Sequence, residues 1–158
     1  VNKMAKSHPS DRRAEFANDT KTIKNLTAAL YEAICFDADR PQDWDRISNL
    51  VIPEGRFGFS MGNPFVFLTL DDFKEFATEH MKAAEEKFIE EEISQVVLEF
   101  GCIAHVSSSY SGVYDDGKLI RRGINSIQLM HEDDRWWLVS MIWDDESPEN
   151  PLPSEYLP

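Results

Sequence analysis

His105 is the residue whose chemistry stands out first, because an imidazole titrates close to neutral pH and can accept or donate a proton. In the strand register derived below, four polar residues share its face of a sheet: Ser107, Arg122, Ser126 and Gln128. This grouping is compatible with a general acid/base site. It is equally compatible with a hydrogen-bonded histidine inside an ordinary sheet, and both interpretations stay open.

Several large or charged side chains could complete a binding site around this histidine. Arg122 could hold an anionic ligand through paired hydrogen bonds, or it could pair with a nearby acid. Aromatic residues and methionine could line an apolar pocket or could fill the core. The predicted ligand-binding residues are Tyr31, Trp44, Ser107, Arg122, Ser126, Gln128, Met141 and Trp143.

The histidines and cysteines do not suggest a metal centre. His8, His80 and His131 are widely separated, without the spacing of metal ligands. Cys35 and Cys102 form no CxxC pair and are expected to be buried free thiols. We therefore expect neither a metal ion nor another cofactor.

Charge argues against two classes of partner. Sixteen Lys and Arg against 29 Asp and Glu give a formal net charge of -13, which repels nucleic-acid phosphates and anionic lipid headgroups. No apolar run approaches the roughly 20 residues of a membrane span. We expect a cytoplasmic protein without nucleic-acid or membrane partners; residues 1–10 lack the apolar core of a signal peptide, although a removed one stays open.

Three helices are predicted in the first half of the chain. Apolar residues recur at steps of seven, three and four from Phe16 to Ile34, which predicts a long helix from Asp11 to Phe36. Pro41 is well placed to begin a short second helix. Thr69 and Asp72 form a capping box at the start of a third helix, which is expected to continue to a charge-rich run at 85–87.

The remaining segments have the patterns of β-strands. Ile52 to Phe59 and Phe65 to Leu68 predict a hairpin, and Ile89 to Trp143 predicts a three-stranded antiparallel meander. Gly101 is expected to mark a bulge or bend inside the first long strand. The order of helices, hairpin, helix and meander defines an α+β fold, in which three N-terminal helices pack on a strongly bent antiparallel sheet.

The two meander turns fix a register. If Asp116-Gly117 is a two-residue turn, the facing pairs include His105 with Gln128, Ser107 with Ser126 and Ser111 with Arg122. If Asp133-Asp134 is the next turn, the facing pairs are Gln128 with Val139, Ser126 with Met141 and Ile124 with Trp143. This register places Met141 and Trp143 on the same face as His105.

The other face of the meander is more apolar. It carries Val106, Ile127, Leu129, Trp136, Leu138 and Ile142. Since three helices can cover one face of a sheet, the second face is expected to meet another subunit. We predict a homodimer through the outer sheet face, with Trp136, Leu138 and Ile142 in the interface, unless a one-residue slip exchanges the two faces.

Parts of the sequence resemble a known superfamily. The runs Arg121 to Leu129 and Arg135 to Trp143, joined by an acidic turn, resemble the closing strands of nuclear-transport-factor-2-like proteins, including SnoaL-like and ketosteroid-isomerase-like members. The strand Gly101 to Val106 and the tail Asn150 to Pro153 resemble a mostly bacterial branch. The resemblance spans roughly Ala14 to Leu157. It implies a cone-shaped half-barrel, a pocket between the first helix and the concave sheet, and dimers.

The resemblance does not fix a reaction, because the superfamily contains isomerases, dehydratases, hydrolases and proteins that only bind or assemble. Scytalone-dehydratase-like members use a histidine and a helix-borne aspartate, which implies His105 with Asp37 or Asp39. Ketosteroid-isomerase-like chemistry would use Tyr31, but serine, histidine and asparagine stand where acids are expected. Epoxide-hydrolase-like chemistry needs an Asp-Arg-Asp set, of which Arg122 is one member.

Three functional hypotheses follow, all on one domain. The domain is predicted at 11–146, between a flexible tail at 1–10 and a proline-rich extended tail at 147–158. The first hypothesis is a homodimeric pocket protein that binds a small, largely apolar organic molecule. The second is a cofactor-free isomerase or dehydratase with His105 as general acid/base and Asp37 as its partner. The third is an assembly module without catalysis.

Overall fold

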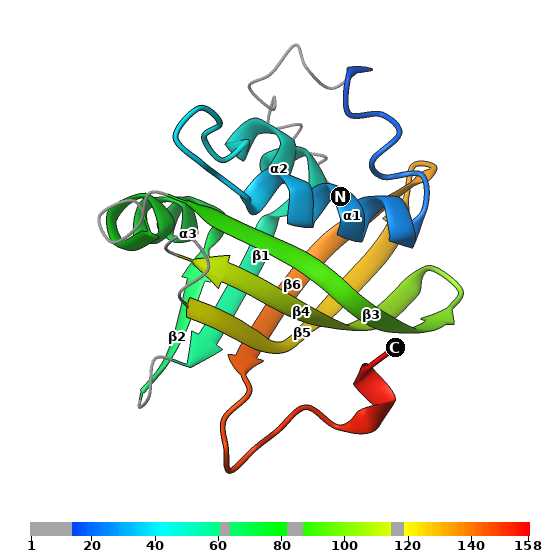
Figure 1. The fold of residues 1–158 in the computed structure, drawn as a ribbon. Coiled ribbons are helices and arrows are strands. Elements are labelled where there is room, and N and C mark those ends of the chain that lie inside the picture. The colour runs from blue at the N-terminus through cyan, green and yellow to red at the C-terminus, as the bar shows by residue number, and fades with distance from the viewer. Residues whose placement is uncertain (1–13, 61–63, 82–86, 115–118) are drawn as a thin grey trace.

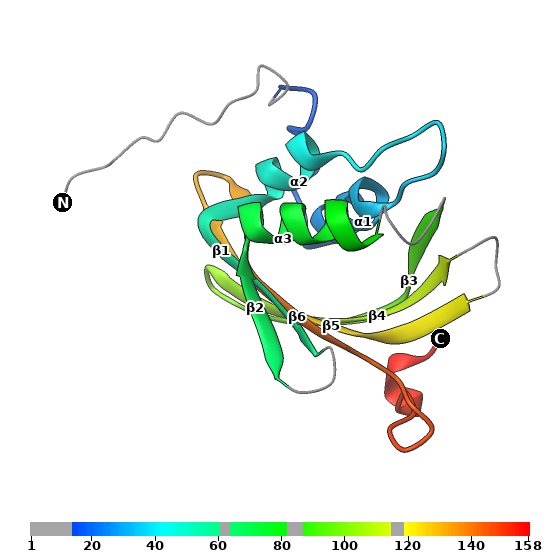
Figure 2. The same ribbon diagram turned by 90° about the vertical axis from the view of Figure 1, so that its left-hand side faces the viewer.

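A layer of helices covers the concave face of a curved, open six-stranded sheet (Figures 1 and 2). The computed structural model describes residues 14–60, 64–81, 87–114 and 119–158. The strand order is β2-β1-β6-β5-β4-β3. Neighbouring strands are antiparallel except for β1 and β6, which run parallel. The predicted α+β class, with three helices packed on one bent sheet, is confirmed.

Helix α1 (Ile23–Ile34) is shorter than the predicted helix. Thr22 has an extended backbone, and its side chain accepts a hydrogen bond from the backbone N–H of Asn25. Thr22 is therefore the N-cap of α1, and its extended backbone prevents the helix from reaching further toward the N-terminus. Residues 14–20 instead form turns, and Asp11 lies outside the described residues.

The other two helices begin at side-chain caps. Helix α2 (Trp44–Leu50) starts after Asp43, whose carboxylate caps it, so the prediction that Pro41 is its first residue is wrong. Helix α3 (Leu70–Phe76) starts at the predicted capping box of Thr69 and Asp72. It continues as a π-helical turn, η2 (Ala77–Met81), where the sequence pattern predicted α-helix. The end of the predicted helix lies outside the described residues.

The predicted hairpin is confirmed as strands β1 (Val51–Ser60) and β2 (Phe65–Thr69). The predicted three-stranded meander is wrong, since four strands follow. They are β3 (Phe88–Phe100), β4 (Ile103–Tyr114), β5 (Leu119–Glu132) and β6 (Arg135–Asp145). Gly101 has φ +58, the left-handed conformation that glycine tolerates, and so makes a turn instead of a bulge.

The predicted register is correct for one strand pair and partly wrong for the next. Strands β4 and β5 pair His105 with Gln128 and Ser107 with Ser126, as predicted. Asp133 and Asp134 both have positive φ, as a two-residue hairpin turn requires. Between β5 and β6, however, the register shifts after Leu129 and Leu138, so the pairs are Gln128 with Ser140, Ser126 with Ile142 and Ile124 with Asp144.

The register shift is a β-bulge, which reverses the side-chain orientation of the β6 residues that follow it. Met141 now pairs with Ile127, and Trp143 pairs with Asn125, so both side chains lie on the face that the helices cover. The prediction that Met141 and Trp143 share a face with His105 is therefore wrong. A bulge inserts one unpaired residue, which exchanges the faces of every residue beyond it.

The apolar face of the meander packs beneath the helices. Val106, Ile127 and Leu138 are fully buried against Leu26, Ile47 and other core residues. Trp136 and Leu138 thus belong to the core, and the prediction that they form a dimer interface is wrong. Ile142 alone of the three predicted interface residues lies exposed on the outer face.

The C-terminal tail lies on the outer side of the sheet, opposite the helices (Figure 2). It contains a short 3-10 helix, η4 (Ser154–Tyr156), so it is not extended throughout as predicted. Ser109 on β4 donates a 2.6 Å hydrogen bond to the carbonyl of Tyr156. Arg122 forms a paired contact with Glu146, which also accepts the N–H of Leu152.

Candidate functional site

The inner face of the sheet, which faces the helices, divides along the strands into an apolar end and a polar end. Near the Asp133-Asp134 turn its residues are apolar and buried in the core. Beyond Val106 and Ile127, most inward positions become polar. They are Glu90, Glu92 and Gln95 on β3, Ser108 and Tyr110 on β4, Arg121 and Asn125 on β5 and Asp145 on β6. We call this set, together with Tyr31 on α1, the polar end.

A directed chain of hydrogen bonds crosses the polar end. The amide of Asn125 donates to the Tyr31 hydroxyl at 2.9 Å, and Ser108 donates to the Glu92 carboxylate at 2.6 Å. Because the Ser108 proton is used on Glu92, Tyr31 must be the donor in its 2.7 Å contact with Ser108. Gln95 adds a second hydrogen bond to Glu92. The chain therefore runs from the amide through two hydroxyls to a carboxylate.

Tyr31 is held neutral by its surroundings. The side chain is buried beneath α1, and burial raises the pKa of its hydroxyl well above the usual range. The hydrogen bonds with Ser108 and Asn125 oppose this effect, and the negative charges of Glu90 and Glu92 add to it. Tyr31 is thus a fixed hydrogen-bonding group and not a source of phenolate.

Glu90 is the most perturbed acid of the polar end. Its side chain keeps some solvent contact, yet surrounding protein raises the pKa of its carboxyl from 4.5 to about 8, with a smaller contribution from the charge of Asp145. Among the described residues its carboxyl has no hydrogen-bond partner or counter-charge. The backbone of Glu90 is held in place, because its N–H and C=O both contact the thiol of Cys35. An acid with a near-neutral pKa can gain or lose a proton at physiological pH.

Gly123 makes room for the Tyr110 ring, whose hydroxyl contacts Asp145, another acid of the polar end. Tyr110 crosses over Gly123 and donates a 2.6 Å hydrogen bond to Asp145. A Cβ on Gly123 would collide with the Tyr110 ring and with the carbonyl of Asp144. Asp145 also lies 3.8 Å from Arg121, in a pair whose two side chains are both substantially exposed.

Aromatic rings border the polar end. Trp143 stacks on Phe59 with ring centroids 4.7 Å apart and meets Phe73 edge-on at 5.7 Å. Phe73 also stacks on Phe57 and contacts Trp44. Trp143 is paired directly with Asn125, so an apolar wall adjoins the hydrogen-bonded chain.

The structure divides the predicted site residues between two faces. Tyr31, Met141 and Trp143 lie on the inner face, and Trp44 packs beside them from α2. The other predicted residues lie on the outer face: His105, Ser107, Arg122, Ser126 and Gln128. One pocket therefore cannot contain both groups.

His105 and Asp37 each have partners of their own. The two ring nitrogens of His105 lie 2.7 Å from the Gln128 amide and 3.2 Å from the Ser107 hydroxyl. Asp37, in the loop after α1, accepts the backbone N–H groups of Asp39 and Arg40. These contacts match a hydrogen-bonded sheet histidine and a turn-forming aspartate. A catalytic role for the pair remains an untested prediction.

Sequence reasoning missed Glu90, Glu92, Ser108, Asn125 and Asp145 as site residues. The signal that could have found them is the two-residue alternation from buried Phe88, which puts Glu90 and Glu92 on the inner face. Asn125 and Ser108 alternate in the same way with core residues Ile127 and Val106.

A surface groove of about 520 Å³ lies elsewhere, between α1 and α2. Its lining includes Glu32, Arg40, Trp44 and Arg46. Arg46 is already paired with Asp19 and Glu32 at 2.7 and 2.8 Å, so the charges of this groove satisfy each other. The polar end, with its uncompensated Glu90, is the better candidate for a site.

Among the described residues, no cluster of three or more histidine, cysteine, aspartate or glutamate residues could hold a metal ion. Cys35 is buried but Cys102 is exposed, so the prediction that both thiols are buried is wrong. No helix in the described part of the chain is long and apolar enough to cross a membrane.

Comparison with known proteins gives matches in structure only. No protein-family model matches the sequence, and no curated protein matches it. Among solved structures, a hexachlorocyclohexane dehydrochlorinase from Novosphingobium barchaimii matches with a TM-score of 0.64 at 8% identity, over 87% of this chain and 92% of that one.

Two other solved structures have the same architecture. A candidate scytalone dehydratase from Novosphingobium aromaticivorans has a TM-score of 0.62 at 12% identity, with 85% of each chain covered. A nuclear-transport-factor-2-like protein of unknown function from Silicibacter pomeroyi has a TM-score of 0.57 at 14% identity, over 87% of this chain and all of that one. These similarities show that the fold of this chain belongs to the class of cone-shaped α+β domains. The chain has the fold of the nuclear-transport-factor-2-like superfamily, as the sequence resemblance implied.

Proposed function

We propose that the chain binds a small, largely apolar organic molecule at the polar end of the inner face, between α1 and the sheet. The observation that carries this proposal is the carboxyl of Glu90, which is partly buried, has no hydrogen-bond partner among the described residues and lies in the same polar end as Tyr31, Asn125 and Asp145. Partial burial removes some of the water that would solvate such a carboxyl. A ligand that contacts it would take the place of that water.

The composition of the surroundings fits a ligand with one polar group. Binding sites for small molecules are mostly apolar, with a few polar groups that fix orientation. Trp143 and Phe59 supply the apolar wall, and the polar end supplies fixed hydrogen-bonding atoms.

The test is an NMR titration with benzyl alcohol as a neutral aromatic probe. Two side-chain amides on the same strand serve as reporters, since Asn125 lies inside and Gln128 lies outside. We expect the Asn125 amide and the Trp143 indole N–H to shift together and saturably. Shifts confined to Gln128, or no saturable shift at either, would contradict the proposal.

Proton transfer is a second candidate function, favoured by the near-neutral pKa of Glu90. In this function Glu90 would replace His105 as the general base of the isomerase or dehydratase hypothesis. A dehydrochlorinase and a candidate dehydratase share the fold, although this likeness extends to fold alone. Deuterium exchange at the acidic carbon of a ketone probe such as 2-indanone should rise with pH through about 8, because only ionised Glu90 is a base. Exchange that Glu90→Gln leaves intact and His105→Gln removes would favour the histidine instead.

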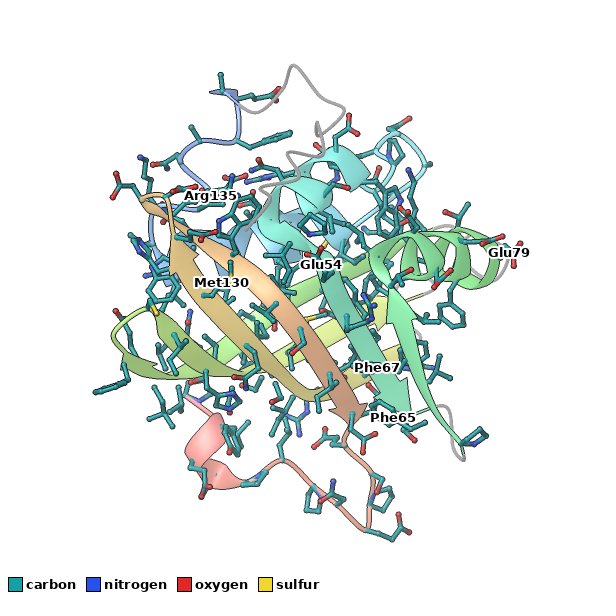
Figure 3. The ribbon with its side chains drawn as sticks, turned by 180° about the vertical axis from the view of Figure 1, so that it is seen from behind. Glu54, Phe65, Phe67, Glu79, Met130 and Arg135 are labelled. Atoms are coloured by element: carbon teal, nitrogen blue, oxygen red, sulfur yellow. The ribbon has the colours of Figure 1, made fainter. Side chains whose placement is uncertain are left out.

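We also propose a homodimer formed through the outer sheet face. Exposed apolar side chains gather there on both flanks of a polar centre. Figure 3 shows Phe65 and Phe67 on β2, beside the end of β1, where they are 51% and 57% exposed. The opposite flank carries Val96, Leu98, Phe100 and Ile103. Large exposed apolar patches are typical of interfaces.

Sedimentation analysis tests this assembly. The wild-type chain should sediment as a dimer, and Leu98→Lys should shift it to the monomer. The matched control is Glu99→Lys, because Glu99 is also exposed but lies on the other face of β3. A monomeric wild-type chain would contradict the proposal.

A further inference from the structure

The hydrogen-bond donors of the polar end are already used inside the protein. The hydroxyl proton of Tyr31 goes to Ser108, and that of Ser108 goes to Glu92. The amide of Gln95 also donates to Glu92, and the hydroxyl of Tyr110 donates to Asp145. A ligand therefore meets few free donors from these side chains.

The acceptors, by contrast, are in excess. Glu90 and Glu92 stand two residues apart on one strand and direct their side chains to the same face. Within the described residues, no ion pair joins either carboxylate to a cation, whereas Asp145 has Arg121 nearby. The negative charges of Glu90 and Glu92 both raise the pKa of the Tyr31 hydroxyl. The polar end is thus rich in acceptors and negative in charge.

Resting on the proposed function, we propose that the ligand is a small amine whose ammonium group contacts Glu90, with its apolar part against Trp143 and Phe59. An ammonium carries three donors and no acceptor, which complements a site with spare carboxylate oxygens. Charge-assisted hydrogen bonds of this kind are about twice as strong as neutral ones. The face of an indole ring also attracts a cation.

Other ligand classes fit less well. An anion would be repelled by Glu90, Glu92 and Asp145, whose negative charges outnumber the one positive charge of Arg121. A neutral alcohol can donate one hydrogen bond to a carboxylate but carries no positive charge to balance it. The raised pKa of Glu90 agrees with a missing counter-charge, because a bound cation would favour the ionised carboxylate.

A charge series of three similar probes tests the inference: benzylamine, benzyl alcohol and benzoate. Dissociation constants are measured by calorimetry at about pH 8.5, where Glu90 is largely ionised. We expect benzylamine to bind about tenfold more tightly than benzyl alcohol, which corresponds to about 1.4 kcal/mol, and benzoate to bind more weakly than either.

Two adjacent variants separate the site from the general negative charge of the protein. Glu90→Gln should reduce the affinity for benzylamine to that for benzyl alcohol. Glu91→Gln removes the same charge on the exposed outer side of β3 and should leave the tenfold preference unchanged. The fold of each variant is checked by its circular dichroism spectrum and melting curve.

The outcomes distinguish this inference from the function on which it rests. If benzyl alcohol shifts the Asn125 amide while benzylamine binds no better, the site stands and the amine preference is refuted. If the loss in Glu91→Gln equals that in Glu90→Gln, the preference arises from overall charge and the inference fails. If no probe shifts Asn125 or Trp143, both proposals fail.

Discussion

Replacing Glu90 by glutamine should change how the stability of the protein responds to pH. The pKa of Glu90 is raised from 4.5 to about 8 in the folded chain, first by burial and then by the charge of Asp145. Between these two values the unfolded chain has lost the proton and the folded chain still holds it. Stability therefore falls as pH rises through this interval and levels off above about 8.

The size of this effect follows from the two pKa values. Each unit of difference is worth about 1.4 kcal/mol, so the full interval corresponds to at most about 5 kcal/mol. Between about pH 5.5 and 8.5 the same relation gives roughly 3 kcal/mol. Glutamine does not titrate, so the variant should gain this amount of unfolding free energy relative to the wild-type chain over that range.

Urea unfolding at several pH values, followed by circular dichroism, measures the difference directly. Comparing variant with wild type removes the pH dependence contributed by the other acids of this strongly acidic chain. Glu91→Gln is the matched control and should show no such trend, because Glu91 is exposed. A constant difference between Glu90→Gln and wild type from about pH 5.5 to 8.5 would refute the assignment of Glu90 as an enclosed acid.

Three further variants test the structure, two at the polar end and one at the β5-β6 turn. Tyr31→Phe should lower the unfolding free energy by about 1–3 kcal/mol, because Asn125 and Ser108 lose a buried partner; an unchanged urea midpoint would contradict the hydrogen-bonded chain. Gly123→Ala should cost about 1–3 kcal/mol, since the new Cβ meets Tyr110 and the carbonyl of Asp144, and a melting temperature equal to wild type would show that the ring is placed elsewhere. Replacing Asp133-Asp134 by Asn-Gly should raise the melting temperature, because those residues favour the positive φ of both positions, and a lower value would argue against the turn.

The overall fold could be predicted from the sequence because its signals are local. The capping box of Thr69 and Asp72 marks the start of α3, and the Asp133-Asp134 turn sets the pairing of Leu129 with Leu138. The start of α1 could not be predicted from periodicity, because Phe16 continues the apolar pattern across a region where Thr22 caps the helix. A cap and an apolar stripe compete, and the stripe alone does not show which prevails.

The candidate site was harder to predict because it depends on one irregular position. A single bulge in β6 moves Met141 and Trp143 to the face opposite His105, and nothing in the local sequence marks it. Which face the helices cover is also a tertiary property. Once that face is known, simple alternation from Phe88 leads to Glu90 and Glu92.

Crystals of the protein soaked with benzylamine and benzyl alcohol would test the central claim most directly. The account predicts electron density for the probe on the inner face, between Trp143 and Tyr31, with the amine nitrogen within hydrogen-bond distance of Glu90. Density only in the groove beside Arg40 and Trp44, or only against His105 on the outer face, would contradict it.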